Sequence, residues 1–391
     1  MRKGLLGLLG SVAIIVSACG GAASPAPSEA PASGAPPASE APAASPTPEA
    51  FDPATIFATD YAPEAGTPGG TIVFGDWQEA NEFNPYYYGN VTEANVVSAV
   101  YSGLLVQTHD FKMMPSDAVE APTVQNGGVK VPGDGGDAMT VTWKLRDGLK
   151  WSDGQPLTCD DYKFAWEWVL NPDNTGLYGG TVGYEDITAV DCSGTDMVLH
   201  YKNIYEAYLF VPATPMPRHY FGTTPVADMV NHEGYRPEQM PNLPVSGAFK
   251  FESVTPTQEL RLVRNDTYVS PGPNGHAAYL DNLIWKWYGD ADAMIAGFRG
   301  GEIDFATDLQ DSDIPKVADL GDQVSAVPAL LYEFLRPNHG AAECSRNTAV
   351  ADRGAGCPVS DPAIREALKY AVNKAEINDR LLGGNTELAN T

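Results

Sequence analysis

The sequence predicts a mixed α/β fold on an exported chain. Two patterns in the body support this fold class: alternating apolar and polar residues typical of strands, and apolar residues three and four positions apart typical of helices. A third observation, an apolar leader followed by a proline-rich stretch, predicts export. About 320 residues follow that stretch, which is long enough for two domains.

Residues 1–18 have the pattern of a lipoprotein signal peptide. Arg2 and Lys3 precede an apolar run from Gly4 to Ser17, which is shorter than the ~20 residues of a transmembrane helix. The run ends in VSAC, which resembles a bacterial lipobox, and in such signals the cysteine (here Cys19) is lipidated. The resemblance implies a membrane lipid anchor that faces the extracellular side or the periplasm.

Residues 19–68 predict a disordered tether between this anchor and the body. They consist largely of Ala, Pro, Ser, Gly and Glu without an apolar period. Such a composition buries too little surface to offset its ordering entropy, and proline keeps it extended.

The charge balance disfavours nucleic acid and anionic membrane surfaces as partners. The chain has 24 Lys+Arg against 50 Asp+Glu and a net charge of -26; removal of Arg2 and Lys3 with the signal leaves -28 (-26 minus 2). A negative surface of this size repels polyanions and is common in soluble exported proteins.

Four cysteines remain after Cys19, and an even number in an exported protein predicts disulfides. Three pairings are possible, and we favour the two between neighbours in the chain, Cys159–Cys192 and Cys344–Cys357. We find no CxxC, HExxH, P-loop, dinucleotide fingerprint or G-x-S-x-G elbow. The sequence therefore predicts no metal, no cofactor and no catalytic residues.

The elements follow in order. Residues 69–77 predict a strand and 92–105 a helix, capped by Thr92 and ending near Gly103, with Val96, Val97 and Val100 buried. Between them, Asn84-Pro85 marks a turn, and three consecutive tyrosines follow that cannot all share one face.

Residues 138–146 predict a strand with Val141, Trp143 and Leu145 on one face. Thr158 and Asp161 form a capping-box pattern at the start of a helix. The apolar spacing along that helix predicts core packing for Tyr162, Ala165, Trp166 and Val169.

Later segments predict two hairpins, at 184–202 and 245–269, a strand at 280–288, and a helix over Asp292–Arg299 followed by a short strand. Ser360 is expected to cap a helix that runs to Gly383 and Gly384. Its apolar stripe comprises Ile364, Ala367, Leu368 and Ala371.

The stretch LRDGLKWSDGQPLTCDDYKFAWEWVL, Leu145–Leu170, resembles the signature region of the extracellular solute-binding proteins of family 5, the oligopeptide, dipeptide and nickel receptors of ABC importers. Four further marks occur in the family's order: FNPYYYGN, VSGAFKFESV with LRLVRNDTY, RGGEIDFA, and DPAIREALKYAVNKAEI. Together they extend from residue 69 to about residue 384.

The resemblance implies a two-lobed periplasmic-binding-protein-like α/β fold of class II, with an extra subdomain in lobe one. Lobe one would comprise residues 69–330, with the inserted subdomain at about 110–230. Residues 331–391 would form the hinge and the start of lobe two. Family members usually continue much further, so we expect lobe two to be incomplete in this chain.

The resemblance also implies ligand-binding residues. The stretch after Asn84-Pro85 lines the cleft in the family, which makes Tyr86, Tyr88, Gly89, Asn90 and Val91 candidates. Tyr178 and Glu333 match family positions at a ligand-contacting tyrosine and at the hinge strand. The alternative to ligand binding is a structural role: a tyrosine cluster in the core or on the surface, and a hinge salt bridge for Glu333.

These features imply a monomeric, non-enzymatic substrate-binding protein that passes peptide-like solutes to an ABC permease and its ATPase. The alternative in the same fold is another solute, such as an oligosaccharide, a nickel chelate or an opine-like compound. A surface hydrolase or a structural lipoprotein is the alternative from another class, but the sequence offers no nucleophile with a convincing partner.

Overall fold

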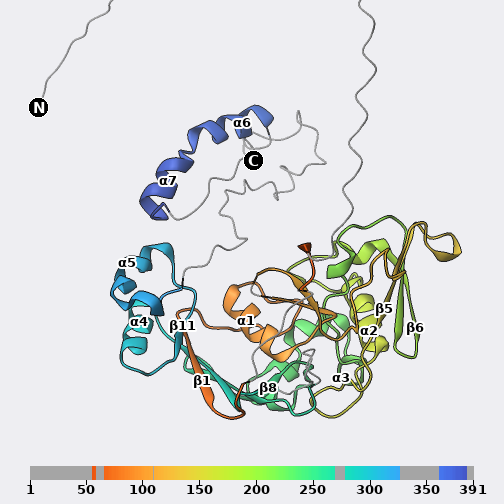
Figure 1. Cartoon of the computed structure of the whole chain (residues 1–391), viewed down its shortest axis with the longest axis horizontal. Coiled ribbons are helices and arrows are strands. Elements are labelled where there is room, and N and C mark those ends of the chain that lie inside the picture. The colour runs from red at the N-terminus through yellow and green to blue at the C-terminus, as the bar shows by residue number, and fades with distance from the viewer. Residues whose placement is uncertain (1–54, 59–65, 109, 269–277, 326–360, 385–391) are drawn as a thin grey trace, which may run out of the picture. The chain divides into compact units, whose positions relative to one another are not determined.

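The computed structural model describes residues 55–58, 66–108, 110–268, 278–325 and 361–384 (Figure 1). Cys19, Glu333, Cys344 and Cys357 lie outside these ranges, as do the predicted signal peptide and most of the predicted tether. Mixed strands and helices make up the described part, which agrees with the predicted α/β class. The helices are α1 Val91–Val100, α2 Cys159–Val169, α3 Arg218–Phe221, α4 Ala291–Arg299, α5 Ile314–Val317, α6 Pro362–Ala371 and α7 Lys374–Leu381.

The first sheet has five strands in the order β11-β1-β10-β9-β8. β1 runs parallel to both of its neighbours, whereas β10, β9 and β8 pair antiparallel. Because β1 and β11 are parallel, the residues that follow them leave the sheet at the same edge. The strands are β1 Thr71–Asp76, β8 Phe249–Thr255, β9 Glu259–Arg264, β10 Asn282–Trp287 and β11 Phe305–Ala306.

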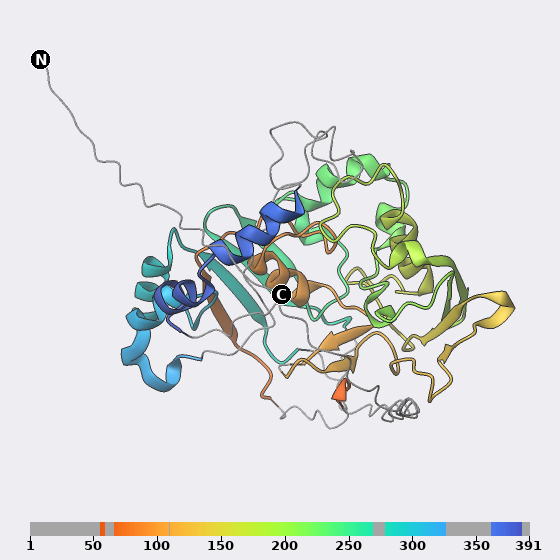
Figure 2. The same ribbon diagram turned by 90° about the horizontal axis from the view of Figure 1, so that it is seen from above.

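A second sheet has four antiparallel strands in the order β4-β5-β7-β6. It lies to the right of β1 in both views (Figures 1 and 2), and it packs its own core around Trp143, Trp151 and Tyr162. The strands are β4 Val129–Lys130, β5 Met139–Lys144, β6 Ile187–Ser193 and β7 Asp196–Tyr201, and a separate hairpin joins β2 Leu105–Gln107 to β3 Met113–Pro115.

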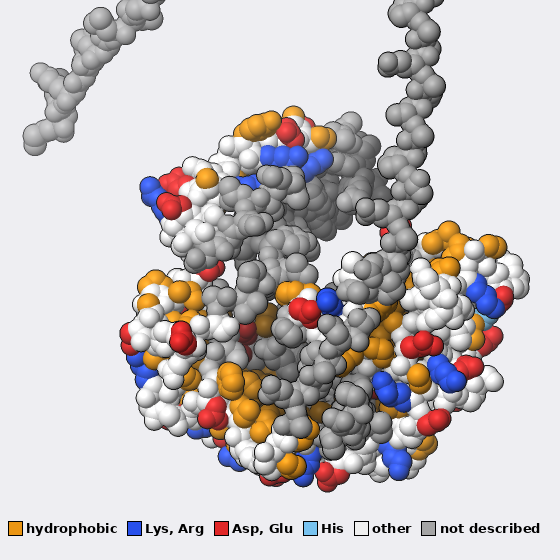
Figure 3. All heavy atoms as spheres, in the orientation of Figure 1, with side chains coloured by type: hydrophobic (Ala, Val, Ile, Leu, Met, Phe, Trp, Pro, Cys, Tyr) orange, Lys and Arg blue, Asp and Glu red, His pale blue; other side chains and the backbone are white. Residues whose placement is uncertain are grey.

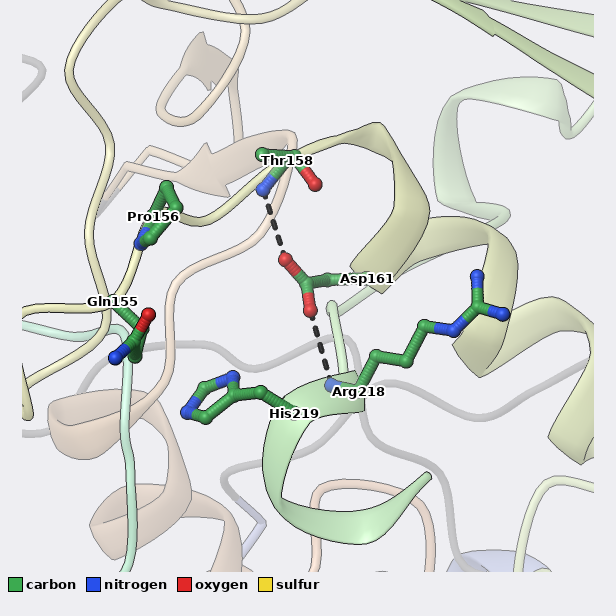
Figure 4. Close-up of a pocket in the computed structure, with 6 residues that line it drawn as sticks. All are labelled: Gln155, Pro156, Thr158, Asp161, Arg218 and His219. Carbon is green, nitrogen blue, oxygen red and sulfur yellow. Dashed lines mark hydrogen bonds between the residues drawn. The ribbon is translucent and has the colours of Figure 1, made fainter. Parts of the chain in front are cut away.

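The predicted cap of α2 is confirmed. The backbone N–H of Thr158 donates to Asp161 Oδ2 at 2.9 Å, and Asp161 Oδ1 accepts from the backbone N–H of Arg218 at 3.0 Å (Figure 4). The predicted buried face is partly wrong, because Trp168 is buried and Trp166 is only half-buried. The predicted Cys159–Cys192 disulfide is present and ties the first residue of α2 to β6.

The predicted boundaries of α1 are wrong by a few residues. The helix begins at Val91 with Asn90 as its cap, not Thr92, and it ends at Val100, three residues before Gly103. The predicted buried side is confirmed, since Val96, Val97 and Val100 are all buried.

The C-terminal helical region differs from the prediction in two ways. Asp361 caps α6 in place of Ser360, and the helical stretch is split in two because Val372 leaves the helical conformation and Asn373 caps α7. The apolar stripe of α6 is exposed in the described structure, including Ile364 and Leu368.

The visible face of the body carries acidic and basic side chains interspersed among neutral ones (Figure 3). The negative net charge is therefore not gathered into one continuous patch on that face. Over the residues that the structure describes, no helix combines the length and apolar character that crossing a bilayer requires.

Candidate functional site

Two loops that are far apart in the chain, residues 84–91 and 174–184, lie against each other; we call them the paired loops. The backbone N–H of Tyr178 donates to the carbonyl of Tyr86 at 3.2 Å. A Cβ atom on Gly89 would lie 3.3 Å from the ring of Tyr178. The structure thus brings the candidate Tyr178 together with the segment that holds the candidates Tyr86, Tyr88, Gly89, Asn90 and Val91.

Tyr87, which the sequence analysis did not single out, also joins the paired loops. Its side chain is buried, and its hydroxyl donates to Asn174 Oδ1 at 3.0 Å. Gly176 packs on its ring so closely that a Cβ there would come within 2.5 Å of it. No sequence pattern distinguished Tyr87 from its two neighbours, because burial of one of three adjacent tyrosines depends on the opposite loop.

Tyr86 supports the paired loops from inside. Its ring contacts Trp168 edge-on, and its hydroxyl donates to the carbonyl of Thr214. The hydroxyl of Tyr184 lies 3.5 Å from that of Tyr86 and accepts from the backbone N–H of Ala213. Burial raises the pKa of Tyr86 well above its usual range. The phenol therefore stays neutral and keeps the proton that it donates in its hydrogen bond.

Other members of the paired loops face solvent. Tyr178 is 72% exposed, Val182 is 70% exposed and Val91 is 48% exposed. Exposed aromatic and aliphatic side chains on a well-supported surface are the groups that commonly contact ligands. Tyr88 is half-buried against the core that includes Val96 and Trp168, and Gly89 is exposed.

Asn90 has a definite structural role. Its Oδ1 accepts from the backbone N–H of Glu93 at 2.8 Å and so caps α1. An N-cap side chain satisfies a helix N–H that has no partner within the helix. The cap places Val91, the next residue, at the exposed start of α1.

Glu93 organises the first of the paired loops, and the sequence analysis missed it. This carboxylate is 6% exposed, and three backbone N–H groups donate to it: those of Asn81 at 3.2 Å, Glu82 at 3.1 Å and Gly89 at 2.9 Å. A buried carboxylate is stabilised by several such bonds. The spacing Asn90-x-x-Glu93 at a helix start was the available signal, since it resembles a capping box.

Replacing Glu93 by glutamine is expected to lower the free energy of unfolding by about 2 kcal/mol. The amide Nε2 cannot accept from Gly89, so a buried N–H loses its acceptor. Urea denaturation of the two proteins measures this difference. The control is Glu185→Gln, an exposed glutamate in the 3₁₀ turn Tyr184–Asp186. An unchanged midpoint for Glu93→Gln would contradict a loop-organising role.

A separate hollow of about 300 Å³ lies beside the cap of α2 (Figure 4). Its arginine and its histidine both face carboxylates: Arg218 lies 4.0 Å from Asp160, and His219 Nε2 lies 2.8 Å from Asp153 Oδ2. None of the candidate site residues lines it, so we place the candidate site at the paired loops. The lining residues are Gln155, Pro156, Thr158, Asp161, Arg218 and His219.

In the described ranges, no three His, Cys, Asp or Glu side chains are grouped in a way that would hold a metal ion.

Comparison with known proteins decides the family. Residues 135–391 match the family described as "Bacterial extracellular solute-binding proteins, family 5 Middle". The chain belongs to this family. Family 5 was the assignment that the stretch Leu145–Leu170 and the four further marks predicted.

Two curated relatives illustrate the likeness. The oligopeptide-binding protein AppA of Bacillus subtilis is 29% identical over 83% of this chain and 54% of its own length. The periplasmic oligopeptide-binding protein OppA of Escherichia coli is 23% identical over 82% of this chain and 57% of its own length. The chain therefore spans little more than half the length of these relatives.

Solved structures confirm the periplasmic-binding-protein fold class. AppA from Bacillus subtilis in complex with a nonapeptide matches with a TM-score of 0.63 and 26% identity, over 83% of this chain and 57% of that one. NikZ from Campylobacter jejuni in complex with Ni(L-His) matches with a TM-score of 0.58 and 20% identity, over 82% and 57%. The second likeness concerns the fold alone.

Proposed function

We propose that this family 5 protein is the lipid-anchored, extracytoplasmic substrate-binding protein of an ABC importer. It captures peptide-like solutes as a monomer and delivers them to the permease and its ATPase. The observation that carries the proposal is the joining of residues 86–91 to Tyr178 in one supported, partly exposed surface. Three parts of the proposal rest on the sequence alone: lipidation of Cys19, the tether at residues 19–68, and ligand contact by Glu333.

Peptide is the favoured solute class because of the relatives. AppA and OppA are named oligopeptide-binding proteins, and AppA was solved with a nonapeptide. Extended peptides commonly bind through main-chain hydrogen bonds with pockets that tolerate varied side chains. The paired loops offer exposed backbone and neutral side chains suited to such contacts.

Another small solute is the second candidate in the same fold. NikZ was solved with Ni(L-His), and a neighbour with a TM-score of 0.54 is an EDTA-binding protein. Both are below 25% identity, so they support only the capacity of the fold to hold chemically different ligands. A receptor function, not catalysis, is common to both candidates.

Replacing Tyr178 by alanine is expected to leave stability unchanged within about 0.5 kcal/mol and to weaken peptide binding about tenfold or more. The side chain is largely exposed, so its loss removes contact surface for the ligand but little packing within the fold. Thermal shift and calorimetry with a pooled library of two- to nine-residue peptides measure both quantities.

The matched control is Val124→Ala, an exposed apolar residue outside the paired loops. Equal binding by wild type and Tyr178→Ala would contradict the placement of the site. A thermal shift with Ni(L-His) or sugars, and none with any peptide, would replace the peptide proposal by the second candidate.

A further inference from the structure

A tryptophan and an aspartate that are far apart in the sequence meet at one edge of the first sheet. Trp77 directly follows β1, and Asp308 lies two residues beyond the parallel strand β11. The indole Nε1–H of Trp77 donates to the backbone carbonyl of Asp308 at 2.8 Å, and both residues are half-buried. Ligands commonly bind outside the carboxyl ends of parallel strands, which is where this pair lies. Neither residue was a candidate in the sequence analysis.

Hydrogen bonds attach this edge of the sheet to the helix that carries the candidate site. Asp76, the last residue of β1, is fully buried, and its Oδ2 accepts from the hydroxyl of Thr92 at 2.8 Å and from that of Thr307 at 3.2 Å. Thr92 lies in the first turn of α1, directly after the candidate residues. Trp77 and Asp308 directly follow Asp76 and Thr307 in the chain. The pair therefore lies beside the start of α1.

The charge at this edge is negative. Residues 76–93 and 302–313 contain nine Asp and Glu side chains and no Lys, Arg or His. Two lysines of neighbouring elements are already engaged: Lys286 on β10 donates to a backbone carbonyl at 3.4 Å, and Lys316 on α5 pairs with Asp313 at 2.9 Å. The net field of these segments therefore favours a positive charge on a ligand.

The Trp77 ring is a second feature that suits a cation. The face of an indole ring attracts ammonium and guanidinium groups more strongly than the face of any other aromatic side chain. Its hydrogen bond to Asp308 fixes the ring, and the same residue carries a carboxylate. A carboxylate forms strong, charge-assisted hydrogen bonds with these cations.

We propose that Trp77 and Asp308 form a subsite for a basic side chain of the ligand, that of lysine or arginine. The indole face contacts the cation and the Asp308 carboxylate accepts hydrogen bonds from it, while the main chain of the peptide lies on the paired loops. This inference rests on the proposed function, and it narrows the ligand class to peptides that carry a basic residue.

Calorimetry on the full chain with three matched series of peptides tests the proposal. Each series consists of alanine hexapeptides that carry a single Lys, Gln or Glu at each position in turn. The tightest Lys peptide is expected to bind roughly tenfold more tightly than the tightest Gln peptide, and the Glu peptides are expected to bind most weakly. Equal affinities of the Lys and Gln series would overturn the subsite and leave the peptide function in place.

Two variants assign the preference to this pair. Trp77→Leu removes the ring, and Asp308→Asn removes the charge at a left-handed backbone position (φ 56°) that Asn tolerates. Each is expected to lower the preference for Lys over Gln to about threefold or less, with little change for the Gln peptides. The control Asp147→Asn makes the same change in net charge at an exposed residue after β5 and should keep the full preference. A full preference in both Trp77→Leu and Asp308→Asn would overturn the assignment.

A probe smaller than a peptide separates this inference from the proposed function and needs no variant to fold. Acetyl-lysine methylamide and acetyl-glutamine methylamide are added in turn to the wild-type chain, and the indole N–H resonance of Trp77 is followed by NMR. We expect a shift with the lysine probe alone. That shift without any peptide binding would contradict the proposed function and support the subsite. An unchanged resonance with the lysine probe would overturn the subsite, whatever the peptides do.

Discussion

Trp151→Ala is expected to lower the free energy of unfolding by about 3–5 kcal/mol. The Trp151 side chain is 0% exposed in the core of the second sheet. Truncation removes a large buried apolar surface and leaves a cavity that a close-packed core fills only in part. Urea denaturation followed by circular dichroism measures the loss.

The control is Trp151→Phe, which keeps an aromatic ring and should cost clearly less than alanine. Because Trp151 lies outside the paired loops, the fraction of Trp151→Ala that remains folded should bind peptide like wild type. A loss in stability below about 1 kcal/mol, or a selective loss of binding, would reverse the roles that we assign to Trp151 and Tyr178.

Breaking the Cys159–Cys192 disulfide is expected to cost about 3–4 kcal/mol. The bond closes a loop with a sequence separation of 33, and a cross-link of this length removes conformational freedom from the unfolded chain. Unfolding of the double variant Cys159→Ala/Cys192→Ala, compared with wild type under non-reducing conditions, measures the effect.

Cys159 is buried and Cys192 is exposed, so the single variant Cys192→Ala serves as the control. It breaks the bond and keeps the buried sulfur, and the difference between the two variants isolates the packing contribution of Cys159. If Cys192→Ala unfolds at the wild-type midpoint, the bond does not form in the purified protein.

Most of the secondary structure could be predicted from local sequence patterns. Alternating residues in 138–146 gave β5, and Thr158 with Asp161 gave the start of α2, because capping and alternation depend on residues only two or three positions apart. The boundaries were less reliable. Asn90 caps α1, although Thr92 was predicted to do so. Both residue types are favourable N-caps, so neither residue type nor spacing distinguishes them in the sequence.

The sequence alone was sufficient for the family, because the family's marks depend on the order of residues along the chain. It favoured Cys159–Cys192 among three possible pairings and proposed the stretches that hold the candidate site, and the structure supplied the bond. The three-dimensional structure was needed to show that Tyr87 is buried while Tyr178 is exposed, and that Glu93 gathers three loop amides. It was also needed for the contact of Thr307 with Asp76. The parallel pairing of β1 and β11 brings Thr307 to Asp76 across 231 positions of sequence, and burial of a charge depends on every segment packed around it, not on its neighbours in the chain.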